Sequence, residues 1–95
     1  MMMASRAAHS SVASAARAMD VDVVWVDTDD RGRMNGDATR AAVVRLSDAE
    51  VARVFAVVAT AGTTNVGVVD DLAGVGEVAR HVGAWFHVEI GRAHV

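Results

Sequence analysis

Short apolar runs alternate with helix-forming stretches along this chain. Three runs have the length of β-strands and are rich in β-branched or aromatic residues; they cover residues 20–27, 55–60 and 84–88. Residues 55–60 (FAVVAT) are apolar without polar alternation, which is typical of a strand covered on both faces. The pattern therefore predicts a buried sheet.

The stretches between these runs predict helices. Residues 9–19 (HSSVASAARAM) are rich in alanine and have serines near their start, and residues 37–46 and 47–54 form two shorter helical pieces. Ser47 and Glu50 have the spacing of a capping box at the start of the second piece.

The last predicted helix begins at an acidic pair, Asp70 and Asp71, and runs to about Val82, with Gly83 suited to its C-terminal end. The predicted order is thus α-β-α-β-α-β. Strands separated by helices favour right-handed crossovers and a parallel sheet, so the fold class is α/β with three parallel strands. Three strands make a thin sheet with open edges, and we expect a piece of a larger domain.

Composition narrows the classes of function. The chain has 95 residues, of which 53% are hydrophobic, and a net charge of −3, which favours a packed core and argues against a general nucleic-acid binder. No apolar run is long enough to span a bilayer, so no membrane partner is expected. The absence of cysteine favours a reducing compartment, and we expect a cytoplasmic protein. All nine basic residues are arginines, so this chain has no side-chain amine nucleophile.

Polar residues gather where the predicted strands end, and open parallel sheets bind ligands beyond that edge. Residues 62–65 (GTTN) follow the second strand, His87 and Glu89 close the third, and His9 begins a helix that can face the same edge. Spacing alone favours a turn at 62–65 in which the threonines bond their own backbone. Glu89 is equally compatible with a partner for a positive ligand nitrogen and with an acid that is solvated or paired with an arginine.

Other motifs are weaker. Residues 74–79 (GVGEVA) match a dinucleotide fingerprint but lie inside a predicted helix. Residues 87–89 (HVE) give half of a zinc deaminase signature without its cysteines. The aspartates of residues 20–30 are divided between strand faces and strand ends, so they predict no metal site.

Four segments together indicate a family: SRAAHSSVASAARAM, DDRGRM, FAVVATAGTTNVGVVDDL and AWFHVE. In order and spacing they resemble the middle of the large domain of pyridoxal-phosphate-dependent group II amino-acid decarboxylases, over residues 5–89. The resemblance implies a fold type I domain, the cofactor pyridoxal 5′-phosphate, and decarboxylation of an α-amino acid through an aldimine. It also implies a homodimeric parent protein with a small-molecule amino-acid substrate.

The resemblance carries roles to individual residues. His9 matches the histidine that stacks on the cofactor ring near the substrate, and Thr64 matches a threonine that contacts the cofactor. Glu89 stands where the family has an aspartate that pairs with the pyridinium nitrogen, and His87 matches the supporting histidine of the same motif. The pair at 70–71 matches an acidic pair that we interpret as structural.

The chain departs from the family near its end. The catalytic lysine that the family has downstream is absent, so the 95-residue chain is expected to be inactive. Residues 90–95 (IGRAHV) resemble a translated sequencing adapter, which predicts an artefactual tail after a partial decarboxylase domain at 1–89. In that case the codon of Glu89 is a hybrid and the true residue is aspartate.

Two alternatives stay open from the sequence. One is another fold type I enzyme, a lyase or an aminotransferase. The other is a small non-enzymatic nucleotide-binding α/β module that depends on Gly74 and Gly76.

Overall fold

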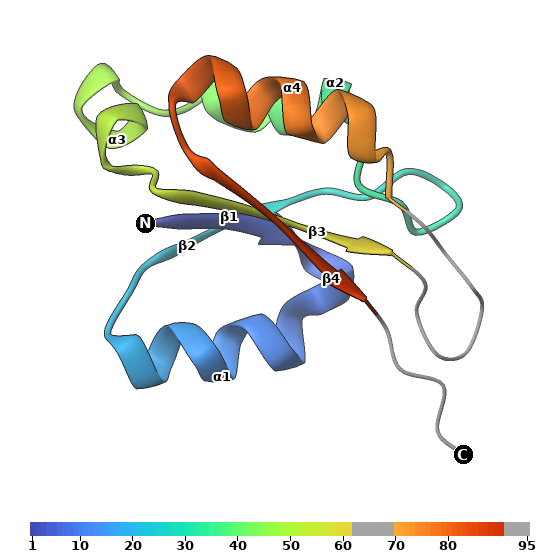
Figure 1. Cartoon of the computed structure of the whole chain (residues 1–95), viewed down its shortest axis with the longest axis horizontal. Helices are drawn as coiled ribbons and strands as arrows, with labels where there is room; N and C mark the ends of the chain where they lie inside the picture. Colours follow the sequence, from blue (N-terminus) through green and yellow to red (C-terminus); the bar gives the residue numbers. More distant parts are fainter. Residues whose placement is uncertain (62–69, 91–95) are drawn as a thin grey trace.

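The computed structural model describes residues 1–61 and 70–90, and it confirms an α/β fold with a parallel sheet. Figure 1 shows the sheet between two helical layers, with α1 on one face and α2 and α4 on the other. The elements in chain order are β1 (Met2–Ser5), the 3-10 helix η1 (Arg6–Ala8), α1 (His9–Met19), β2 (Val23–Val26), α2 (Gly36–Val44), α3 (Asp48–Arg53), β3 (Ala56–Ala61), α4 (Leu72–Val82) and β4 (Trp85–Ile90).

The sheet has the strand order β2-β1-β3-β4, and each neighbouring pair is parallel. The prediction of three strands was wrong, because the described residues form four. The missed strand is β1, whose sequence MMAS contains no β-branched or aromatic residue. Its position between β2 and β3 supplies hydrogen bonds on both sides and burial of all four residues, so tertiary context overrides a weak local propensity.

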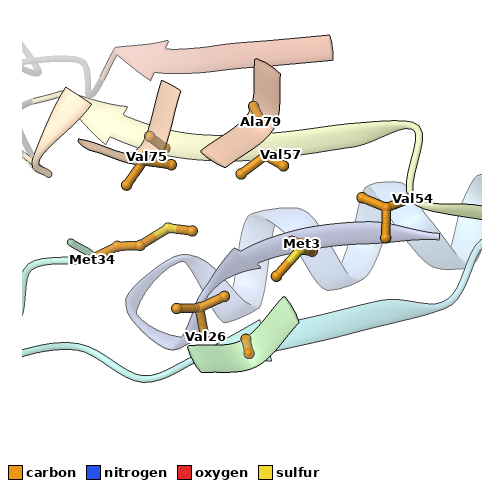
Figure 2. Close-up of a cluster of buried hydrophobic side chains, with 9 residues drawn as sticks. Met3, Val26, Met34, Val54, Val57, Val75 and Ala79 are labelled. Carbon is orange, nitrogen blue, oxygen red and sulfur yellow. The ribbon is translucent and has the colours of Figure 1, made fainter. Parts of the chain in front are cut away.

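Two hydrophobic clusters hold the helical layers against the sheet. The larger lies on the face covered by α2 and α4 (Figure 2), and it includes Met3, Val26, Met34, Val57 and Val75. The smaller lies beneath α1 and consists of Met2, Ala4, Val12, Ala16, Ala56 and Val58. Successive residues of β1 and β3 thus enter opposite clusters, which explains why these strands are apolar without alternation.

The helix ends agree with the predicted capping residues. Ser47 and Glu50 form the capping box of α3, with Ser47 N donating to Glu50 Oε1 at 2.9 Å and Glu50 N donating to Ser47 Oγ at 3.2 Å. Gly83 ends α4 in the left-handed conformation at φ 75°. The helix predicted to begin at residue 37 begins instead at Gly36, because the side chain of Asn35 caps it and accepts from Ala38 N at 2.7 Å.

Within the described residues, we find no helix with the length and apolar character needed to cross a membrane.

Candidate functional site

The candidate site lies at the carboxyl edge of the sheet. All four strands are parallel, so their last residues lie along one edge: Ser5, Val26, Ala61 and Ile90. The start of α1, at His9, lies close to this edge because η1 is only three residues long and joins β1 directly to α1. Glu89 is the penultimate residue of β4 and pairs in register with Thr60 of β3.

His87 and Glu89 lie on the same face of β4, because they are two residues apart on a strand. Their register partners are Val58 and Thr60, and Val58 belongs to the cluster beneath α1. Both residues therefore lie on the face of the sheet that α1 covers. His87 is exposed and Glu89 is half-buried, so a carboxylate and an imidazole are accessible there together.

A cavity of about 330 Å³ opens on this face between α1 and β4. Among the described residues that line it, Glu89 and His87 are the only ionisable ones, and the others are apolar. The lining consists of Met2, Val12, Ala15, Met19, Ala56, Val58, His87 and Glu89. An apolar cavity with a few polar groups at one end is the usual form of a small-molecule site.

The structure brings only part of the predicted site together. His87 and Glu89 share the cavity, and α1, which begins at His9, supplies three of its lining residues. Thr64 lies outside the described residues, as does the rest of the loop at 62–69.

The interpretation of the acidic pair as structural is confirmed. Asp70 is 5% exposed, and its carboxylate accepts from Met34 N at 2.8 Å and from Thr60 N at 2.7 Å. The backbone N–H of Asp70 also donates to Thr60 O at 2.8 Å. Because Thr60 pairs with Glu89, this buried acid braces the strand position next to the candidate site.

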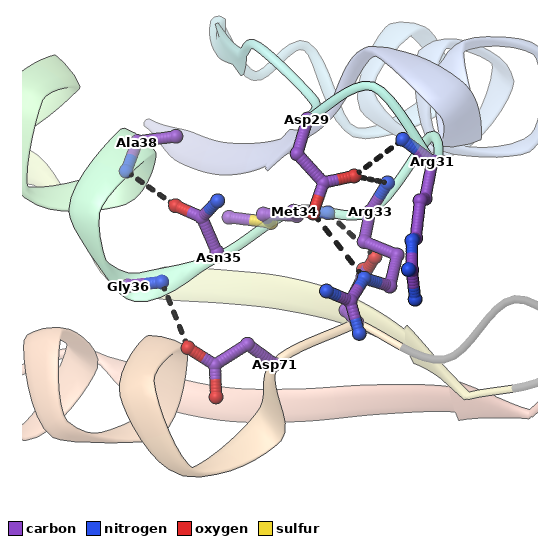
Figure 3. A network of polar contacts seen from close by, with 9 residues as sticks. Asp29, Arg31, Arg33, Met34, Asn35, Gly36, Ala38 and Asp71 are labelled. Atoms are coloured by element: carbon purple, nitrogen blue, oxygen red, sulfur yellow. Dashed lines mark hydrogen bonds and ion pairs between the residues drawn. The ribbon is translucent and has the colours of Figure 1, made fainter.

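Asp71 joins the starts of two helices (Figure 3). Its carboxylate accepts from Gly74 N in α4 and from Gly36 N in α2, each at 3.1 Å, and its own N–H donates to Met34 O at 2.9 Å. A Cβ placed on Gly74 would lie 3.1 Å from Gly36 Cα, so α2 and α4 approach more closely here than most Cβ contacts allow.

This packing removes the basis of the nucleotide-binding alternative. Gly74 and Gly76 lie inside α4 rather than at a strand-to-helix turn. A Cβ on Gly76 would lie 3.0 Å from the ring of Phe86, so the second glycine is also explained by close packing. The fingerprint needs its glycines beside a phosphate at the start of a helix.

Hydrogen bonds to the Asp29 side chain hold the turn after β2 (Figure 3). The Asp29 carboxylate accepts from the backbone N–H of Arg31 and of Arg33, each at 2.9 Å, and from Arg33 Nε at 3.2 Å. The hydrogen bond from the Arg33 backbone is the main reason why the pKa of Asp29 lies below its ordinary value. Among the residues that the structure describes, no group of acids and histidines is placed to hold a metal ion.

Sequence reasoning missed one contact at the carboxyl edge. Arg6 Nε donates to Asp27 Oδ1 at 2.7 Å, which links the first residue after β1 to the first residue after β2. No sequence motif indicates this pair, because it depends on the register of two neighbouring strands.

The sequence matches the family described as the pyridoxal-dependent decarboxylase conserved domain over residues 1–93. The chain belongs to this family. It is 36% identical over 88 residues to a glutamate decarboxylase-like protein of Gibberella zeae, covering 90% of this chain and 17% of that protein. It is 34% identical over 90 residues to the histidine decarboxylase of Rattus norvegicus, covering 95% of this chain and 14% of the relative.

The fold is shared with solved members. The crystal structure of mouse CSAD superposes with a TM-score of 0.79 at 33% identity, covering 92% of this chain and 19% of that one. The chain therefore spans less than a fifth of the length of these relatives. The cofactor is pyridoxal 5′-phosphate, and the observed groups fit it: a half-buried carboxylate at a strand end, beside an apolar cavity, suits a flat ring with a cationic nitrogen.

Proposed function

We propose that this sequence is a segment of a full-length carboxy-lyase that decarboxylates an α-amino acid with pyridoxal 5′-phosphate. The observation that carries the proposal is the placement of Glu89 and His87 together on an apolar cavity of about 330 Å³ on the α1 face of the sheet. The family membership supports the same reaction type. Residues 1–89 of this chain form part of the large domain of that enzyme, and the parent acts as a cytoplasmic homodimer.

When bound, the cofactor withdraws electrons from the substrate as carbon dioxide leaves. The role of Glu89 is to keep a proton on the ring nitrogen, because a carboxylate within ion-pair distance favours the charged form of a nearby base. Half-burial strengthens this interaction relative to an exposed pair. Apolar side chains line the rest of the cavity beside the same carboxylate.

The remaining roles follow from the family motif. His9 stacks on the cofactor ring, Thr64 contacts the cofactor, and His87 supports Glu89. His87 and Glu89 are neighbours on one strand face, so a supporting contact needs no rearrangement of β4.

The role of Glu89 is tested by cofactor titration of the full-length enzyme. The acid at position 89 is replaced by its own amide, Glu89→Gln for the sequence as given or asparagine where the gene encodes aspartate. This exchange keeps the shape of the side chain but removes its charge, and we expect the affinity for the cofactor to fall at least about tenfold. Glu77→Gln is the matched control, because Glu77 is exposed on α4 and borders the groove between α2 and α4 instead. Equal affinities for the two variants would contradict the proposed role.

The 95-residue chain alone is expected to release no carbon dioxide, because it contains no lysine to hold the cofactor covalently. The assay compares the purified chain with a cofactor control that contains no protein. Release above this control would show that the segment supports the reaction without the missing lysine.

We also propose that residues 90–95 derive from a sequencing adapter and that the codon of Glu89 is a hybrid. Strand β4 includes Ile90, which pairs with Ala61, and the family match continues to residue 93, so the nucleotide sequence is the decisive test. Independent genomic reads across codon 89 should encode aspartate and then diverge from IGRAHV. Reads that encode glutamate followed by the same six residues would refute the proposal.

A further inference from the structure

The ion pair of Arg6 and Asp27 joins the carboxyl ends of two neighbouring strands. Ser5 and Val26 are register partners at the ends of β1 and β2, and Arg6 and Asp27 directly follow them. Arg6 Nε donates to Asp27 Oδ1 at 2.7 Å, a short distance typical of a charge-assisted hydrogen bond. The pair therefore connects the exits of both strands at one point.

Arg6 is also the first residue of η1, the 3-10 helix that leads into α1. The other α-helices begin at polar caps, but the N-cap of α1 is Ala8, whose side chain offers no acceptor, and the first turn of α1 contains no acid. Ser5, at the end of β1, also holds the connection. Ala7 N donates to Ser5 Oγ at 3.0 Å, and Ser5 is only 1% exposed.

Both contacts are made before the helix begins, and both restrain the direction in which the chain enters His9. We propose that Arg6 and Asp27 form a positioning pair that fixes the start of α1, and with it His9, relative to the carboxyl edge. This inference rests on the proposed role of His9 at the cofactor. The two side chains are 62% and 66% exposed, and exposed ion pairs add little to stability, so the effect of the pair is on geometry.

The test uses the full-length holoenzyme and three variants: Asp27→Asn, Arg6→Gln and the double exchange Arg6→Asp with Asp27→Arg. The matched control is Asp22→Asn, which breaks the exposed pair of Asp22 and Arg53 (3.9 Å). Asp22 lies just before β2, so the control pair belongs to the opposite, amino edge of the sheet. The readouts are kcat, KM, the circular dichroism of the bound cofactor and the thermal midpoint.

Each single variant is expected to lower kcat about tenfold, because small misplacements of a group that contacts the reacting system reduce rates strongly. The cofactor dichroism should weaken in parallel, while the thermal midpoint stays within about 2 °C of the wild type. The double exchange should recover part of both losses, and Asp22→Asn should leave kcat and the dichroism unchanged.

Wild-type kcat and dichroism in Asp27→Asn would overturn the inference, and so would losses that follow a matching fall in thermal midpoint. The variant His9→Ala distinguishes a failure of the proposed role of His9 from a failure of the positioning pair. If that variant retains wild-type kcat and dichroism, the role of His9 fails, and the positioning pair fails with it. If His9→Ala loses both while Asp27→Asn loses neither, only the positioning pair fails.

Discussion

The acidic residues of this chain differ in role according to the groups that surround each carboxylate. The position of Glu89 at a strand end could be predicted from a short apolar run and its terminal acid. The partners of Asp70 could not, because one of them, Met34 N, is 36 residues away and reaches the carboxylate only through the fold. The local sequence pattern therefore shows where an acid lies on its helix or strand. Its hydrogen-bond partners depend on the tertiary structure.

Removing the Asp70 side chain should destabilise the protein. Asp70→Ala leaves the N–H groups of Met34 and Thr60 without their acceptor at a buried site, and we expect a loss of about 3 kcal/mol in the free energy of unfolding. Asp71→Ala removes an exposed helix cap and should cost about 1 kcal/mol. Urea denaturation of the full-length enzyme measures both, and equal losses would contradict the bracing role of Asp70.

Asp29 should make the turn after β2 sensitive to acid. Hydrogen bonds, first of all from the Arg33 backbone, hold the pKa of Asp29 below its ordinary value in the folded state. The pKa is lower when folded than when unfolded, so the stabilisation is present above the ordinary carboxyl range and is lost as the pH falls through the lowered value. Asp29→Asn should reduce the loss of thermal midpoint between neutral and acidic pH, and Asp30→Asn is the control because it leaves the Asp29 hydrogen bonds in place. Identical acid profiles would show that Asp29 contributes nothing.

At the scale of elements, sequence patterns predicted the helices better than the complete sheet. Capping chemistry is local, so Ser47, Glu50 and Gly83 could be assigned from spacing alone. Strand β1 was missed because its stabilisation comes from two neighbouring strands rather than from its own residues. The crossing of α2 and α4 was also beyond sequence reasoning, since Gly36 and Gly74 are 38 positions apart by their numbers and meet only in the fold.

Gly74→Ala should reverse the usual preference for alanine in a helix. Alanine in a helix interior is ordinarily better than glycine by about 1 kcal/mol. Here the added Cβ would meet the Asp71 carboxylate and would lie 3.1 Å from Gly36 Cα, so we expect a net loss of about 2 kcal/mol.

Ala73→Gly is the control at the neighbouring exposed position of α4. It should cost about 1 kcal/mol through helix propensity alone. Urea denaturation of the full-length enzyme measures both variants. A gain in stability for Gly74→Ala would show that the two helices do not meet at this glycine pair.

At the scale of the whole molecule, the sheet formed by the described residues has two edge strands, β2 and β4, and large apolar side chains are exposed at the β4 edge. Strand β4 is an edge strand, and Trp85, at its start, is 83% exposed on the same face as His87 and Glu89. Phe55 and Phe86 are also exposed near this edge. An exposed apolar edge strand favours association with another chain. In the isolated segment, nothing among the described residues covers the β4 edge.

The isolated 95-residue chain should therefore associate in solution. Trp85→Lys places a charge on the open edge and should shift sedimentation toward the monomer. Val44→Lys is the control, because Val44 is 77% exposed but lies on α2, away from β4. A monomeric wild-type chain, or an equal response of the two variants, would contradict association through the β4 edge.

The measurement that tests the central claim most directly is the product analysis of the full-length enzyme with a panel of α-amino acids. Carbon dioxide and the corresponding amine are quantified with and without pyridoxal 5′-phosphate. The proposed function predicts equal amounts of both products from at least one amino acid, dependent on the cofactor and strongly reduced in Glu89→Gln. Formation of a keto acid without carbon dioxide would identify an aminotransferase and contradict the proposal, and so would carbon dioxide release that does not require the cofactor.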